Sequence, residues 1–425
     1  MKRRAYRVKS ILPVLLLSAT ALLNMGGCTE NDAEKEELPE VHLSVWCSED
    51  SVPIMDEAMG RFAKLHEKEA SITYVVSAEK EETCRVTVLN NPAAAADIFC
   101  FADDQLEELV NGGAIMEVGE NAQAVIERVG GADSGAAEAA TAYGTLYAYP
   151  LSAGNGYFLY YNKAYLDDKD VADFDSLLAA AGKCGKKVSM DMGSGWYMYS
   201  FFKGAGLYMR QNDEGTANIC NWNAKDTKYK GVDVVQAMLD ISTNPAYINL
   251  DDDCFVEAVR SGSVIAGING AWNAEKIAEA WGDDYCATRL PAYTINGDKV
   301  QMYSLMGYKL MGVSSYTKEP EWSRKAAEYL SGSQVQLRRF EAIGECPADI
   351  SVAKMDKVQA APAIAALAMQ SEYGCSESIL DTFWSPAQIM GIVISAGNPD
   401  GRDLQELLDE AVEGITESIE NKTQE

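Results

Sequence analysis

Two kinds of hydrophobic spacing alternate along the chain after residue 40. Residues 41–46 and 72–76 alternate apolar with other side chains, as half-buried strands do, whereas the apolar positions of 54–65 recur at helical spacing. The apolar run 98–101 has the composition of a strand buried on both faces, and 106–110 form a short helical face. The order strand, helix, strand, strand, helix predicts an α/β body with a largely parallel sheet.

The same reasoning extends to the rest of the body. Residues 143–165 are rich in tyrosine and predict two strands joined by a turn at Gly154-Asn155-Gly156. Helices are expected at 177–181, 196–206, 322–330 and 334–340, a strand at 188–190, a buried strand at 264–268, and a long amphipathic helix at 404–419.

The N-terminus has the pattern of an export signal. Five basic residues precede the apolar run Ile11–Leu23, which is too short for a comfortable membrane span. The following L-N-M-G-G-C resembles a bacterial lipoprotein processing site, which implies a signal peptide at 1–27 and diacylation of the Cys28 thiol. An ordinary signal peptide cleaved nearby is the alternative. Residues 28–40 are polar and charged, and predict a disordered tether.

Composition narrows the possible functions. The chain carries 64 acidic and 36 basic residues, a formal net charge of -28, which disfavours nucleic acid as a partner. We interpret the acidity as a solubility feature, with cation binding as the alternative. The chain has only two histidines, and its ten cysteines show no C-x-x-C spacing. We therefore predict neither a zinc site nor any other cofactor. Asp251-Asp252-Asp253 lacks the spacing of a calcium loop and is expected to start a helix.

Six segments, in this order, resemble one protein family. They are V-H-L-S-V-W (41–46), A-D-I-F-C-F-A-D-D-Q-L-E-E-L-V-N-G-G-A-I (96–115), Y-G-T-L-Y-A-Y-P-L-S (143–152), L-Y-Y-N-K-A-Y-L (159–166), G-S-V-I-A-G-I-N-G-A-W (262–272) and D-T-F-W (381–384). From Val41 to Ile419 the chain resembles the family 1 extracellular solute-binding proteins, the maltose-binding-protein-like substrate-binding lipoproteins of ABC transporters.

The resemblance implies a fold and a division into domains. The fold is the α/β type II periplasmic-binding-protein-like architecture, in which two lobes are joined by a hinge and enclose a ligand cleft. Each lobe is discontinuous in sequence. Lobe one is expected at 41–151 plus 305–356, and lobe two at 152–304 plus 357–421.

The resemblance also implies a set of ligand-binding residues. The matching positions are Trp46, Phe101, Asp104, Gln105, Trp196, Tyr197, Trp272 and Trp384. The glutamate that the family's maltodextrin binders carry after the crossover strand is missing from residues 152–156, where there is a one-residue insertion and Asn155 could supply hydrogen bonds instead. Gln105 replaces a basic residue, and both changes count against maltose itself. The alternative interpretation is that the aromatic residues fill the core and that Asp104 caps the following helix.

The implied function is transport. The chain would capture a sugar or oligosaccharide by hinge closure and deliver it to the membrane subunits of an ABC permease, as a monomer anchored by lipid at the extracellular face of the bacterial cell membrane. Aromatic platforms surrounded by polar groups suit sugars. Two alternatives remain: the same fold binding a polyamine or peptide-like ligand, and a secreted glycosidase. No catalytic motif supports the enzyme, so we expect a binding protein without catalytic residues.

Overall fold

A computed structural model describes residues 38–212, 215–375 and 379–417. The body from Pro39 onward forms one compact unit. The predicted signal peptide at 1–27, Cys28 and most of the predicted tether at 28–40 lie outside the described residues. Within the described ranges, no helix has both the length and the apolar character needed to cross a membrane.

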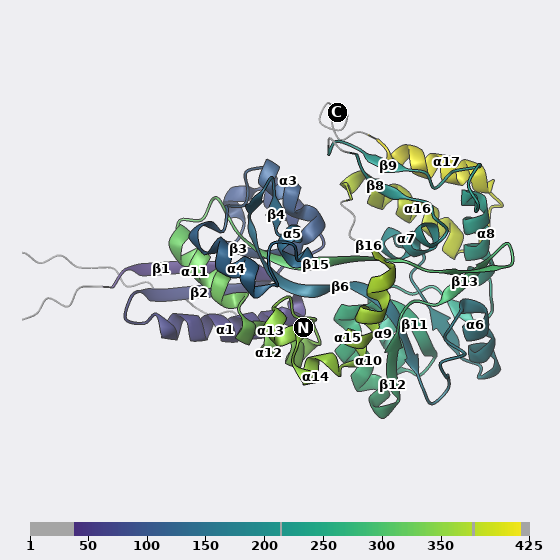
Figure 1. Cartoon of the computed structure of the whole chain (residues 1–425), viewed down its shortest axis with the longest axis horizontal. Coiled ribbons are helices and arrows are strands. Elements are labelled where there is room, and N and C mark those ends of the chain that lie inside the picture. The colour runs from purple at the N-terminus through teal and green to yellow at the C-terminus, as the bar shows by residue number, and fades with distance from the viewer. Residues whose placement is uncertain (1–37, 213–214, 376–378, 418–425) are drawn as a thin grey trace, which may run out of the picture. The chain divides into compact units, whose positions relative to one another are not determined.

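The main sheet has the strand order β10-β7-β11-β6-β15-β3-β1-β2. Two long antiparallel strands at its centre, β6 (Ala148–Asn162) and β15 (Ser304–Val313), connect the two halves (Figure 1). β15 pairs with β3 (Ile98–Ala102), whereas the far end of β6 pairs with β11 (Val264–Gly270) and β12 (Tyr285–Thr288). The sheet is therefore mixed: the predicted parallel pairs occur on both sides, but the connecting strands run against their neighbours.

The predicted turn at Gly154-Asn155-Gly156 is wrong. These residues continue β6 as one strand, in which Asn155 lies opposite Gly307 and Gly156 opposite Met306 of β15. A Cβ on Gly154 would lie 2.7 Å from the Cβ of Cys346, so the glycine permits a close approach of another segment. The glycines that predicted a turn here instead allow close packing.

Lobe one is built around the N-terminal half of the sheet. Its elements include β1 (Glu40–Cys47), α1 (Val52–Leu65), β2 (Ser71–Ala78), α2 (Cys84–Asn90), η3 (Asp103–Gln105), α3 (Leu106–Asn111), α4 (Ala122–Arg128), α5 (Gly135–Ala139), β4 (Thr141–Ala142), β5 (Thr145–Leu146), α11 (Pro320–Leu330) and α12 (Ser333–Ile343). The apolar side chains of α1 recur every three or four residues and pack with Val41, Leu43 and Val45 of β1 in one buried cluster. The strands and helices expected between 41 and 110 are confirmed.

Lobe two has its own core around β7 (Lys187–Ser189) and β11. Its other elements include α6 (Phe174–Lys183), α7 (Gly195–Gly204), β8 (Met209–Gln211), β9 (Asn218–Cys220), α8 (Gly231–Ser242), β10 (Tyr247–Ile248), α9 (Asp252–Arg260), η5 (Ala271–Asn273), α10 (Ala274–Trp281), β13 (Ala292–Ile295), β14 (Asp298–Gln301), α15 (Pro362–Gln370), β16 (Gly374–Cys375), η8 (Asp381–Phe383), α16 (Trp384–Ser395) and α17 (Leu404–Ile415). Helices α8, α16 and α17 pack against one another at one end of this lobe (Figure 1). The short helices α13 (Ile350–Ala353) and α14 (Asp356–Gln359) lie between α12 and α15 in sequence.

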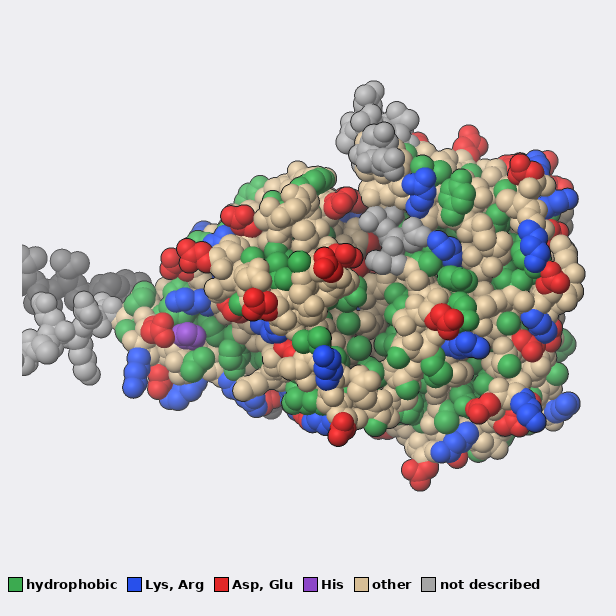
Figure 2. All heavy atoms as spheres, viewed as in Figure 1, with side chains coloured by type: hydrophobic (Ala, Val, Ile, Leu, Met, Phe, Trp, Pro, Cys, Tyr) green, Lys and Arg blue, Asp and Glu red, His purple; other side chains and the backbone are tan. Residues whose placement is uncertain are grey.

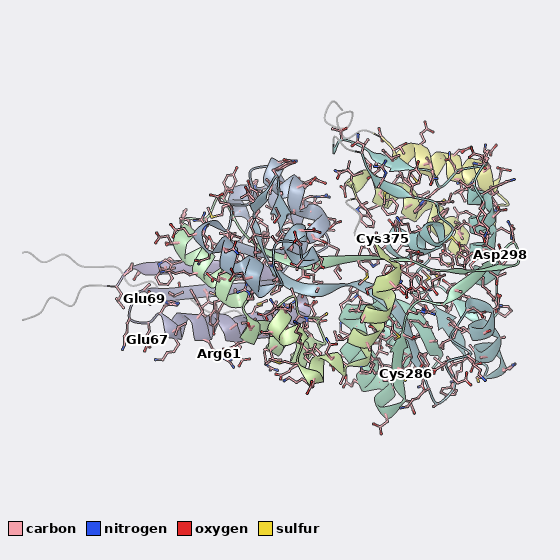
Figure 3. The ribbon with its side chains drawn as sticks, in the orientation of Figure 1. Arg61, Glu67, Glu69, Cys286, Asp298 and Cys375 are labelled. Atoms are coloured by element: carbon pink, nitrogen blue, oxygen red, sulfur yellow. The ribbon has the colours of Figure 1, made fainter. Side chains whose placement is uncertain are left out.

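Charged side chains of both signs and free thiols are distributed over the part of the chain that is described. Acidic and basic side chains are interspersed over the face shown in Figure 2, and Arg61, Glu67 and Glu69 lie near one another beside α1 in Figure 3. The cysteines from Cys47 to Cys346 are free thiols, including Cys286 of β12, which Figure 3 labels. No group of three or more His, Cys, Asp or Glu side chains within these residues could hold a metal ion.

Candidate ligand site at the junction of the lobes

A series of aromatic rings lies in lobe two. Trp384, the first residue of α16, contacts Trp196 of α7 with ring centroids 6.5 Å apart. Trp196 meets Tyr157 of β6 edge-on at 5.7 Å, and Tyr157 in turn meets Tyr197 at 5.0 Å. Trp196 and Trp384 are both partly exposed, and the Trp196 Nε1–H is enclosed without an acceptor among the described residues. The two indoles therefore combine exposed ring surface with an unused hydrogen-bond donor.

Trp272 is held in place by a partly buried carboxylate. Its Nε1–H donates to Oδ2 of Asp252 at 2.9 Å, while Oδ1 of Asp252 accepts from the Tyr197 hydroxyl at 2.7 Å and from Asn269 Nδ2 at 3.0 Å. The indole lies directly over Gly270, where an added Cβ would come within 2.1 Å of ring atoms. One face of the indole is therefore packed against backbone, and its N–H is bonded to the protein.

Lobe one contributes carboxyl groups where β3 ends. Asp103 and Asp104 form the first turn of η3, and the Asp103 carboxylate lies over Gly307 of β15, 2.5 Å from the position of an added Cβ. Burial, followed by the charge of Asp104, raises the pKa of Asp103 to about 7. Burial also raises the pKa of Asp104 to about 6, although the charge of Arg85 opposes that rise. Both carboxyls thus exchange protons near neutral pH.

An ion pair connects the lobes beside these acids. Arg85 of α2 donates from Nη1 to Glu108 at 2.6 Å within lobe one, and its Nη2 lies 2.8 Å from Asp381 Oδ1 in η8 of lobe two. The Arg85 side chain is 9% exposed, so its charge is well shielded from solvent. The pair joins Arg85 of lobe one to Asp381, which lies three residues before Trp384 in the chain.

A buried charge network supports the connecting strand. Lys309 of β15 lies 2.8 Å from Glu345 and 3.0 Å from Glu81, and Arg339 pairs with the second carboxylate oxygen of Glu345. Burial alone would raise the pKa of Glu345, but the charges of Arg339 and Lys309 lower it to about 2. The Lys309 Nζ also lies 5.9 Å from the ring centroid of Trp272. The network therefore adjoins the aromatic part of the site.

Comparison with known proteins decides the family. Residues 58–366, more than half of the chain, match the model of the bacterial extracellular solute-binding proteins. The chain belongs to this family. The resemblance inferred from the ordered segments is thereby confirmed, and so is the α/β two-lobed fold.

Relatives of this solute-binding protein span nearly its whole length. A galactooligosaccharide-binding protein from Bacillus subtilis (strain 168) is 25% identical over 96% of this chain and 97% of its own. A structure solved with acarbose has a TM-score of 0.77 and 24% identity, covering 88% of this chain and 98% of that one. A maltodextrin-binding protein from L. casei BL23, solved without ligand, has a TM-score of 0.73 and 22% identity, covering 88% and 99%. The Bacillus subtilis relative is a binding protein by name, in agreement with the expectation of a non-enzyme.

The structure separates the predicted site residues of the solute-binding protein into two groups. Trp196, Trp272, Trp384, Asp104 and Asn155 are partly exposed at or near the junction. Trp46 is also partly exposed and packs against the core of lobe one, as Trp196 and Trp384 pack against the core of lobe two.

The other three predicted residues are buried. Phe101 is fully enclosed in the core of lobe one, so its ring has no free face in this conformation. The Gln105 amide accepts from Arg85 N at 2.8 Å and donates to Glu81 O at 2.7 Å, which engages it with backbone. Tyr197 is 3% exposed and bonded to Asp252. Helix α3 has no side-chain cap, so the alternative role of Asp104 as a cap is not observed.

Several residues at the junction were not predicted from the sequence. They are Arg85, Asp103, Glu108, Asp252, Lys309, Glu345 and Asp381. Two of them adjoin predicted positions: Asp103 precedes Asp104, and Asp381 begins the D-T-F-W segment. Asp251 caps α9 by accepting from Cys254 N at 2.8 Å, which confirms the acidic cluster as a helix start, but nothing local revealed that Asp252 bonds to two aromatic residues.

Proposed function

We propose that this protein binds a sugar or oligosaccharide at the junction of its lobes, as the capture component of an ABC importer. The observation that carries the proposal is the set of three partly exposed indoles, Trp196, Trp272 and Trp384, in a lobe whose Asp381 pairs with Arg85, the arginine whose charge acts on Asp104 of η3. Sugar rings present C–H faces that pack on flat aromatic surfaces, and their hydroxyls donate to carboxylates. Relatives named for galactooligosaccharide and for maltodextrin support the same ligand class.

Closure of the lobes would complete the site. Arg85–Asp381 and Lys276–Asp50, the latter 2.8 Å apart, join residues of lobe one to residues of lobe two. Such pairs exist only when the lobes are close, so a ligand that contacts both lobes would favour the same state. The proposal keeps Trp46 and Asn155 as ligand-binding residues, together with the partly exposed Trp196, Trp272, Trp384 and Asp104. It also keeps the lobe boundaries after Leu151, Ser304 and Asp356.

The N-terminus completes the proposed role. Cleavage before Cys28 and diacylation of its thiol would tether the body to the extracellular face of the cell membrane, next to the permease subunits that receive the ligand. Replacing Cys28 by Ser in cells that process lipoproteins is expected to move the protein from the membrane fraction to the medium. Retention of the C28S variant in the membrane fraction after a high-salt wash would contradict the lipid anchor.

Calorimetric titration tests sugar binding directly. The purified protein is titrated with galacto-oligosaccharides and malto-oligosaccharides, and we expect saturable binding to at least one series. Replacing Trp196 and Trp384 by Ala should weaken binding at least about tenfold, since two stacking surfaces are lost. Trp322→Phe is the control, because Trp322 packs against Phe62 and His66 in lobe one. Absence of heat with either series, or equal affinity in the double variant, would contradict the proposal.

A cationic ligand is the second candidate. Arg85 pairs with Glu108 and Asp381 and interacts with the charge of Asp104, and Asp103 precedes Asp104 in η3. No cation among the described residues lies within ion-pair distance of Asp103 or Asp104, so an ammonium group could fill that role. The titration therefore includes spermidine as a separate arm. Binding of spermidine with no response to any sugar would favour this candidate over the first.

A further inference from the structure

Asp252 occupies a position that no motif identified. It is the first residue of α9, and its two carboxylate oxygens accept from three side chains on three other segments: Trp272 of η5, Tyr197 of α7 and Asn269 of β11. Helix capping does not require this arrangement, since the cap is supplied by Asp251. Burial raises the pKa of Asp252, and its three hydrogen bonds to donors offset part of this rise.

We propose that Asp252 is a positioning residue that fixes the aromatic surface of lobe two for ligand, an inference that rests on the proposed sugar-binding function. The bond from Trp272 Nε1 sets the rotation of the indole against Gly270. The bond from the Tyr197 hydroxyl sets a ring that contacts Tyr157, and Tyr157 contacts Trp196. One carboxylate thus orients Trp272 directly and supports Trp196 through two intervening rings.

The arrangement also determines what the two indoles offer a ligand. The Trp272 N–H is bonded to Asp252, so Trp272 offers a ligand only ring surface. The Trp196 N–H is enclosed and has no acceptor among the described residues, so a ligand oxygen could bond to it only if the side chains around it moved. Ring surface is therefore the contribution that Trp272 and the partly exposed Trp196 both offer in this conformation.

A carboxylate is needed because donors approach both of its oxygens. In Asp252→Asn, the amide nitrogen would face either the Trp272 N–H or the Tyr197 and Asn269 donors, and that side would lose its bond. We expect about tenfold weaker sugar binding in this variant. Asp253→Asn is the matched control, because it removes the same charge from the first turn of α9 at an exposed side chain.

Trp272→Phe tests the same bond from the other side. Phenylalanine keeps a flat ring but lacks the N–H, so this variant should also bind sugar about tenfold more weakly. Adding Asp252→Asn to Trp272→Phe should cost less than adding it to the wild type, because the bond is already absent. This comparison remains informative if Asp252→Asn alone folds poorly.

A ligand-free measurement separates positioning from sugar binding. In a ¹⁵N-labelled protein, the indole N–H resonance of Trp272, assigned by its loss in Trp272→Phe, should shift in Asp252→Asn and stay in place in Asp253→Asn. An unshifted resonance, or equal sugar affinity in Asp252→Asn and wild type, would overturn the positioning role. If the wild type binds no sugar but the resonance still shifts in Asp252→Asn, the proposed function is refuted while the contact between Asp252 and Trp272 stands.

Discussion

The buried network of Glu345 gives a prediction whose size follows from the structure. Glu345 and Glu81 balance Lys309 and Arg339, and all four side chains are at most 13% exposed. Glu345→Gln keeps the shape of the side chain but leaves one positive charge without a partner. The difference between the ordinary pKa of 4.5 and a value of about 2 corresponds to about 3 kcal/mol of stabilisation. Loss of one partner from a buried pair costs about 3–5 kcal/mol, which is in agreement.

The assay is urea denaturation of the purified protein at pH 7, followed by tryptophan fluorescence. We expect the free energy of unfolding to fall by about 3 kcal/mol in Glu345→Gln. Glu341→Gln is the control, because Glu341 pairs with Lys357 at the surface, where an ion pair contributes little. A loss in Glu345→Gln no larger than that in the control would refute the reasoning.

The pH dependence provides a second check on the same variant. The folded-state pKa of Glu345 lies below its unfolded value, so the stabilisation is present above pH 4.5 and is lost as the pH falls toward 2. The stability difference between wild type and Glu345→Gln should therefore shrink across that interval. A difference that stays constant from pH 6 to the lowest pH at which both proteins fold would show that charge is not its origin.

Three further predictions concern the junction. Asp103 keeps its proton up to about pH 7 in the folded state, so the free energy of unfolding of the wild type should fall as the pH rises from about 4 to 7, by less than about 1.4 kcal/mol per pH unit. In urea denaturation, Asp103→Asn should flatten this slope, and an unchanged slope would count against the burial of this acid. Gly270→Ala should displace the Trp272 indole, lower the free energy of unfolding by about 1–3 kcal/mol and weaken sugar binding. Gly182→Ala should do neither, because the nearest atom to its added Cβ lies at an ordinary 3.6 Å. Asp381→Asn weakens the pair with Arg85 between the lobes, so ligand should dissociate faster in stopped-flow fluorescence, and an unchanged rate would exclude a role of this pair in closure.

Local pattern was sufficient for most elements and for the family. The strand at 41–46, the helix at 54–65 and the buried run at 98–101 depend on side-chain periodicity, which is a property of neighbouring residues. The predicted aromatic positions Trp196, Trp272 and Trp384 followed from ordered motifs, and all three are partly exposed. The sequence by itself therefore determined these elements and pointed to these aromatic positions.

Only the tertiary structure decided which polar groups meet. Asp252 reaches Trp272 across 20 residues and Tyr197 across 55, and Arg85 reaches Asp381 from the other lobe. It also decided that Gly154–Gly156 extend β6, because pairing with β15 holds these residues in an extended conformation. Contacts between residues distant in sequence depend on how whole elements pack, so the side-chain spacing along one segment does not predict them.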